Sequence, residues 1–231
     1  MQIPIGRTLL LALFGLAPGA LAFTPTLHDQ YNNCESGTTS QEWEAANAGF
    51  DAFLADDLVV PASDFGWNAT AVIVDGIYTG SGPVETVNVI FYRDASGLPG
   101  AEVAGCHYDG IAAFGESAGD LSVGLPTPCT LPVVGDANTK YWVAVQSQMD
   151  FDPRGQWYWA DRSVQSNSPA AWMNPPGGWG NGCTDWGRRG ADCGIDTDNP
   201  DQCFAVLGFY GLFSNSFEIG NTSLWSNAVL N

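Results

Sequence analysis

The sequence predicts an all-β fold, a single jelly-roll-like antiparallel β-sandwich with a long, tryptophan-rich loop held by a disulfide. Short segments of alternating apolar and polar residues recur along the chain, and turns rich in glycine and proline separate them. Helix signals are weak. The one candidate, residues 40–54, is interrupted by Gly49 and predicts no more than a turn or two.

About eight short strands are expected. The clearest is 87–93, in which Val87, Val89 and Phe91 share one face. Segment 140–148 alternates in the same way, with Tyr141 and Val143 on one face. Shorter strands fit residues 57–60, 70–78, 102–108, 120–125, 156–160 and 204–210, and Gly97-Leu98-Pro99-Gly100 is one of the expected turns between strands.

The chain divides into three parts. Residues 1–22 are predicted to be a secretory signal peptide, because Arg7 precedes a short apolar run and Ala20-Leu21-Ala22 matches a cleavage site. Residues 23–212 form the expected sandwich, and 213–231 a polar C-terminal tail. The apolar run is shorter than the roughly 20 residues that span a bilayer. The mature chain is therefore expected to have no membrane span and to work in the secreted or cell-surface space.

Six cysteines in an exported chain favour disulfides. We expect Cys106 to pair with Cys129, because both flank one loop beside predicted strands. Cys183 with Cys193 would close a short glycine-rich loop, and Cys34 with Cys203 would join the two ends of the domain. Zinc is disfavoured, because the spacing contains no C-x2-C pair.

The acidic composition limits the partners. The formal net charge is −18 at pH 7, and such a charge repels nucleic acids and anionic membranes. It attracts cations, and calcium prefers oxygen-rich loops. The run Asp196, Asp198 and Asp201 is therefore a candidate calcium site, although as a solvated acidic loop it needs no metal. No other cofactor is expected.

Several segments resemble a group of bacterial secreted β-sandwich domains. The resemblance covers roughly residues 40–208 and rests on 55–61 (ADDLVVP), 91–94 (FYRD), 97–100 (GLPG), 141–146 (YWVAVQ) and 155–157 (GQW). It implies a jelly-roll-like sandwich similar to modules of surface and carbohydrate-binding proteins, with no activity or catalytic residue to carry over. The tail at 213–226 resembles a C-terminal segment of such exported proteins, but departs from its pattern at Asn215, Ser216, Ile219 and Asn221.

Evidence for catalysis is weak. Residues 115–119 spell GxSxG around Ser117, but both histidines precede the serine and no helix is predicted after it. A glycine-rich turn explains this motif better than an esterase nucleophile. Asp56 and Asp57 are adjacent on a predicted strand and should point to opposite faces, which does not suit the paired carboxylates of a glycosidase.

Tryptophans are the most suggestive feature of residues 165–202 and of the strand before them. Flat aromatic rings bind the apolar faces of sugars, and the neighbouring side chains Gln156, Asn167, Asn174, Asn181 and Asp185 offer hydrogen bonds. The rings could equally anchor the long loop. The candidate ligand-binding residues are Trp157, Trp159, Trp172, Trp179 and Trp186.

The sequence therefore predicts a non-catalytic secreted domain that binds a glycan or another cell-surface component. The alternatives are a secreted hydrolase, either a glycosidase or an esterase, and a purely structural surface protein.

Overall fold

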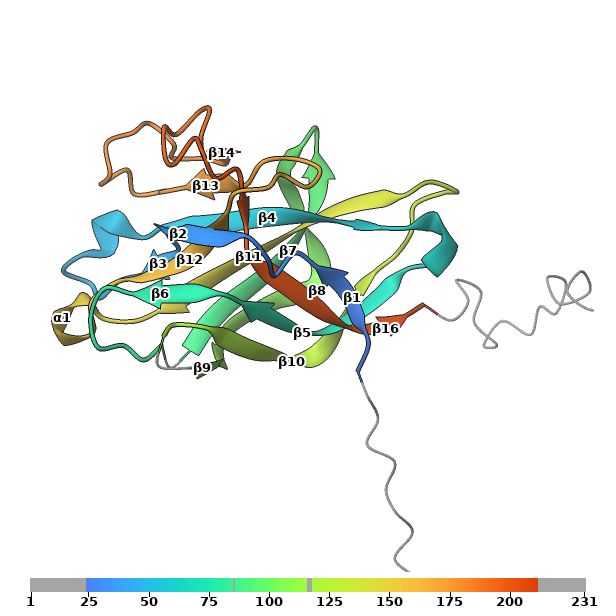
Figure 1. Ribbon diagram of the computed structural model, residues 1–231, viewed down its shortest axis with the longest axis horizontal. Coiled ribbons are helices and arrows are strands. Elements are labelled where there is room, and N and C mark those ends of the chain that lie inside the picture. Colours follow the sequence, from blue (N-terminus) through green and yellow to red (C-terminus); the bar gives the residue numbers. More distant parts are fainter. Residues whose placement is uncertain (1–23, 85, 116–117, 212–231) are drawn as a thin grey trace, which may run out of the picture.

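The computed structural model describes residues 24–84, 86–115 and 118–211, and these fold almost entirely into β-strands (Figure 1). The predicted signal peptide, the tail at 213–231 and Ser117 lie outside these residues. Apart from the short parallel pair of β3 and β11, the paired strands are antiparallel. The all-β, sandwich-like expectation is confirmed.

Two larger sheets form the two layers of the sandwich, and a third, smaller sheet has four strands. The five-stranded sheet has the order β1 (Thr26–Asp29), β16 (Phe204–Tyr210), β5 (Trp67–Val74), β10 (Leu121–Leu131) and β9 (Phe114–Gly115). The seven-stranded sheet has the order β14 (Gly187–Arg188), β13 (Ala171–Met173), β4 (Phe53–Val60), β11 (Thr139–Gln148), β7 (Thr86–Ala95) and β8 (Leu98–Ala112), with β3 (Gln41–Glu42) beside β11. The four-stranded sheet joins β15 (Asp201–Gln202), β12 (Trp157–Arg162) and β2 (Cys34–Thr39), with β6 (Gly76–Tyr78) beside β12.

The main core lies between the two larger sheets. Alternate residues of each strand point inward, so Val72 and Val74 of β5 belong to the same buried cluster as Val89 and Phe91 of β7. Figure 1 shows β4 on one side of this core and β5 with β10 on the other. A smaller cluster on the outer face of the seven-stranded sheet includes Trp142, Tyr92 and Ala55.

The prediction of a single strand over 70–78 is wrong. β5 ends at Val74, and β6 begins at Gly76 in a different sheet, where it pairs with β12. At the junction, the Asp75 N–H donates to the Cys203 carbonyl at 3.2 Å. The change of sheet leaves the alternation of side chains almost intact, which is why the sequence pattern does not reveal it.

The predicted turn at 97–100 is displaced. Ala95 pairs with Leu98 across the β7–β8 hairpin, so the two-residue turn is Ser96-Gly97. Both have positive φ, 58° and 89°, as a tight hairpin of the favoured kind requires. Leu98, Pro99 and Gly100 belong to β8.

The segment 40–54 contains no α-helix. It forms β3, a 3-10 turn η1 (Ala48–Phe50) and the start of β4. A second 3-10 turn, η2 (Ala62–Asp64), follows β4, and a single helical turn, α1 (Phe151–Arg154), follows β11. The expectation of at most a turn or two is confirmed.

The long loop at 165–202 is tied into two sheets. β13 pairs with β4, β14 pairs with β13, and β15 pairs with β12. β13 and β14 add an edge to the seven-stranded sheet, where Figure 1 shows them above β4, and β15 joins the four-stranded sheet. The stretch between β13 and β14 carries Trp179, which lines the site described below.

All three expected disulfides are confirmed. Cys106 on β8 and Cys129 on β10 join the two layers of the sandwich. Cys34 on β2 pairs with Cys203, 169 residues later, just before β16. Cys183 and Cys193 close a small ring within the long loop.

Candidate functional site

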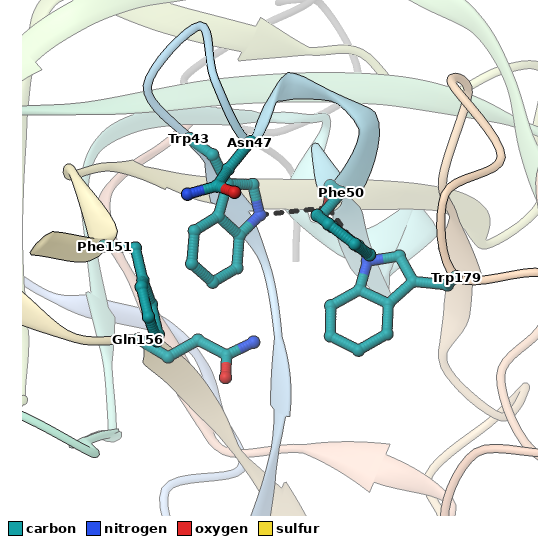
Figure 2. A pocket seen from close by; sticks show the side chains of 6 residues that line it. All are labelled: Trp43, Asn47, Phe50, Phe151, Gln156 and Trp179. Atoms are coloured by element: carbon teal, nitrogen blue, oxygen red, sulfur yellow. Dashed lines mark hydrogen bonds between the residues drawn. The ribbon is translucent and has the colours of Figure 1, made fainter.

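An aromatic hollow of about 210 Å³ lies at one end of the sandwich. Its lining residues come from several separate stretches of the chain and, as Figure 2 shows, surround one space. We call it the aromatic hollow and define it by Trp43, Asn47, Phe50, Phe151, Gln156 and Trp179.

Two chain segments meet closely at this hollow. The Gly178 N–H donates to the Gly49 carbonyl at 2.9 Å, and a Cβ at Gly178 would overlap that carbonyl oxygen. The buried Asn174 side chain donates to the carbonyls of Gly49 and Asp51 at 3.0 and 2.8 Å, and it accepts the Trp179 N–H at 3.0 Å. Asn174 therefore fastens the segment that carries Trp179 to the one that carries Phe50.

One carbonyl oxygen orients both indoles. The Trp43 and Trp179 ring N–H groups donate to the Phe50 carbonyl at 3.0 and 2.9 Å (Figure 2). The Phe50 and Trp179 rings meet edge-on, with centroids 5.4 Å apart. Because the indole donors are already satisfied, the aromatic faces and edges are what a ligand would contact.

Three aromatic side chains at the hollow are substantially exposed to solvent. Trp179, Phe50 and Phe151 are 42%, 41% and 48% exposed. Phe151 lies 5.6 Å from the Trp43 ring, centroid to centroid. Contiguous exposed aromatic surface of this kind is typical of binding sites.

One buried hydrogen-bond donor among the residues that line the hollow, the Gln156 amide nitrogen, has no partner. The Gln156 amide accepts a hydrogen bond from the Tyr158 hydroxyl at 2.6 Å through its oxygen, while its nitrogen is buried and unpaired. Leaving a buried donor unpaired costs about 1–3 kcal/mol. A ligand oxygen in the hollow would remove that penalty once the amide turns toward it.

Carboxylates surround the hollow without lining it. Glu44 accepts hydrogen bonds from the Asn47 side chain and the Phe151 N–H, and the latter lowers the pKa of Glu44. Burial, reinforced by the charge of Glu42, raises the pKa of Asp51, which accepts the Trp43 N–H at 2.8 Å. These negative charges disfavour an anionic ligand.

Three of the five tryptophans predicted to bind a ligand are buried. Trp157, Trp159 and Trp172 have no exposed surface. Their ring N–H groups donate to the carbonyls of Gly119, Cys203 and Thr39, at 2.8, 2.8 and 3.0 Å. Their burial and these hydrogen bonds favour the anchoring interpretation for all three, although Trp172 also lines a second hollow described below.

The remaining two tryptophans lie apart. Trp179 lines the aromatic hollow, and its role as a ligand contact stays a prediction. Trp186 is half-buried and packs edge-on against Tyr92, 5.7 Å away, on the outer face of the seven-stranded sheet. Trp43, Phe50 and Phe151 are not among the predicted site residues, because 40–54 carries only a weak helix signal and Phe151 precedes a strand by several residues.

The aspartates of the candidate calcium site do not converge. Asp201 is fully buried, where it accepts the Ser166 N–H and faces Arg162 at 3.6 Å. Asp196 instead accepts hydrogen bonds from the Ser36 hydroxyl and the Asn199 amide, both polar neighbours near the surface. Within the described ranges, these carboxylates do not bring oxygens together as one ligand set, so calcium at this run stays an untested prediction without a preformed site.

Asp56 and Asp57 contact different partners, as expected for adjacent strand residues. Asp56 accepts hydrogen bonds from the Gln30 side chain and the Gln202 N–H, both at 2.7 Å. Asp57 pairs with Lys140 at 2.9 Å. Both aspartates are fully buried, so they do not form a catalytic pair across a cleft.

One further cluster of possible metal ligands occurs in the described part of the chain. Cys34, Cys203 and Asp75 have ligand atoms within 4.8 Å of one another. The two cysteines are joined as a disulfide, so their sulfurs are not thiolates and do not suit a metal ion.

No family model matches the chain, and no curated protein matches it. The resemblance to secreted sandwich domains therefore stays a prediction. No helix in the described ranges is long and apolar enough to cross a membrane.

Proposed function

We propose that this domain binds a neutral carbohydrate in the aromatic hollow without catalysing a reaction. The observation that carries the proposal is a set of exposed rings, Trp179, Phe50 and Phe151, around a hollow whose wall holds the unpaired Gln156 amide nitrogen. A pyranose ring has apolar C–H faces and a rim of hydroxyls. Aromatic surface contacts the faces, and amides bind the hydroxyls.

The negative charge of the protein favours neutral over anionic carbohydrates as ligands. With a net charge of −18 and carboxylates of Glu44 and Asp51 close to the hollow, the site repels sulfated and uronic acid chains. A neutral glycan avoids that repulsion.

The lining supports binding rather than hydrolysis. A glycosidase needs two carboxyl groups facing the scissile bond, and the six residues that define the aromatic hollow include none. An esterase at Ser117 would lie outside the described residues, and nothing in the hollow supports it.

The proposal places the protein outside the cytoplasm, either secreted or at the cell surface. Three disulfides support this, because oxidising compartments are where such bonds form and persist. The predicted signal peptide at 1–22 supports it independently.

The test is a glycan array probed with the purified, disulfide-bonded protein and with Trp179→Ala. We expect retention by at least one neutral glycan, and a more than tenfold loss of affinity in the variant, equivalent to ~1.4 kcal/mol. Trp179 is partly exposed, so its removal leaves the core intact.

The matched control is Phe209→Ala, which removes a similarly exposed ring, 50% exposed, from β16 outside the aromatic hollow. Its affinity should equal that of the wild type. Binding restricted to anionic glycans, or to none, would refute the proposal, and the latter would favour a purely structural role. Equal binding by Trp179→Ala would place the ligand elsewhere.

A further inference from the structure

A second hollow, of about 340 Å³, adjoins the aromatic hollow and shares Trp179 with it. Its lining includes Gly37, Thr39, Tyr158, Asn181 and Ile195. We call it the threonine hollow. The half-exposed indole of Trp179 borders both spaces.

The threonine hollow repeats the chemistry of its neighbour. Tyr158 supplies an aromatic ring and Asn181 an amide, both half-buried. Gly37 lies close against Tyr158, where a Cβ would be only 2.8 Å from the Tyr158 Cβ. An aromatic ring and an amide suit a second sugar unit.

Each hollow also holds one buried polar atom without a partner. In the aromatic hollow it is the Gln156 amide nitrogen, and in the threonine hollow it is the Thr39 hydroxyl. Both side chains are more than nine-tenths buried, with exposures of 9% and 6%. Each group belongs to a residue that lines its hollow, so a ligand hydroxyl placed there offers the missing hydrogen-bond partner.

The two hollows are linked by a hydrogen bond. The Tyr158 hydroxyl of the threonine hollow donates to the Gln156 oxygen of the aromatic hollow at 2.6 Å. Tyr158 lies opposite Thr39 across the β2–β12 pair, so the two side chains share a face of that sheet. Polar groups of the two hollows are thus connected through Tyr158.

We infer that the site takes a linear neutral oligosaccharide across both hollows, with Trp179 between consecutive units, rather than a single terminal sugar. This rests on the proposed carbohydrate binding and adds a second subsite to it. Alone, the aromatic hollow is smaller than the 300–1,000 Å³ usual for ligand pockets, whereas a ligand that crosses Trp179 has both spaces available.

The experiment compares ligand length in wild type and in Thr39→Val. The probes are the monosaccharides, disaccharides and tetrasaccharides of neutral glucan, mannan, galactan and xylan, titrated calorimetrically. The substitution keeps the shape of the side chain and removes only a hydroxyl that has no partner, so the fold should keep its stability.

For at least one backbone, the wild type should bind the tetrasaccharide at least tenfold more tightly than the monosaccharide. Thr39→Val should lower the tetrasaccharide affinity about tenfold and leave the monosaccharide affinity unchanged. Trp179→Ala should weaken both ligands, because its ring borders both hollows.

Two outcomes overturn the inference, and they are distinguishable from failure of the proposed function. Equal affinities for monosaccharide and tetrasaccharide, or an unchanged tetrasaccharide affinity in Thr39→Val, would remove the second subsite while leaving carbohydrate binding intact. Binding of no neutral probe would remove carbohydrate binding itself, and the second subsite with it.

Discussion

At the scale of single residues, the interior is unusual for the number of charged groups it contains. Asp161 contacts Arg189, Asp201 lies near Arg162, and none of the four is more than 8% exposed at the side chain. Burial raises the pKa of Asp161 to about 6 and that of Asp201 to about 7, although the neighbouring guanidinium groups act in the opposite direction. Burying these charges costs free energy that their pairing offsets only in part.

These raised pKa values predict that the protein is most stable in mild acid. Between about pH 4 and pH 7 the folded state binds more protons than the unfolded state, so the free energy of unfolding falls as pH rises through this window. The loss should be on the order of a few kcal/mol, since one pKa unit corresponds to about 1.4 kcal/mol.

Urea unfolding at pH 5, 6, 7 and 8 measures this dependence. Asp161→Asn, which cannot ionise, should show a smaller fall across the same range. A free energy of unfolding that rises from pH 5 to pH 8 in the wild type would contradict the prediction.

At the scale of elements, the site depends on how one loop is fastened to another. Asn174 connects the backbone of Gly49 and Asp51 to that of Trp179 through three hydrogen bonds. Its side chain is 1% exposed, so it acts as a positioning residue rather than as the ligand contact that the sequence suggested.

Asn174→Ala should therefore loosen the Trp179 segment. Hydrogen exchange at the Trp179 amide should accelerate, and affinity for the array ligand should fall even though Trp179 itself is retained. Gln165→Ala, which removes an exposed amide from the same long loop, should change neither quantity. Unchanged exchange at Trp179 in Asn174→Ala would show that the backbone contact at Gly178 suffices.

At the scale of the whole molecule, the disulfides differ in how much chain they constrain. Cys34 and Cys203 are 169 residues apart, whereas Cys183 and Cys193 are separated by 10. In the chain-entropy model, closing the long loop stabilises the folded state by about 5 kcal/mol and closing the short one by about 3 kcal/mol.

The double substitution Cys34→Ala/Cys203→Ala should therefore lower the free energy of unfolding more than Cys183→Ala/Cys193→Ala does. Denaturant unfolding of the two variants gives the comparison. If the short-loop variant is the less stable of the two, local packing around the long loop, rather than chain entropy, dominates the stability.

The amino-acid sequence by itself determined the all-β class, the paired cysteines and the positions of the strongest strands. The strand at 204–210 matches β16, and 140–148 differs from β11 by one residue. These features follow from local rules: side chains alternate with a period of two along a strand, and glycine or proline interrupts them.

Only the tertiary structure decided which aromatic residues face solvent. Trp157, Trp159 and Trp179 share one side-chain type, yet two are buried and one lines a hollow with Trp43, which is more than 100 residues away in sequence. The physical reason is that burial depends on what packs against a ring from other elements. A contact between Gly49 and Gly178, set by backbone shape and not by any local pattern, created the site.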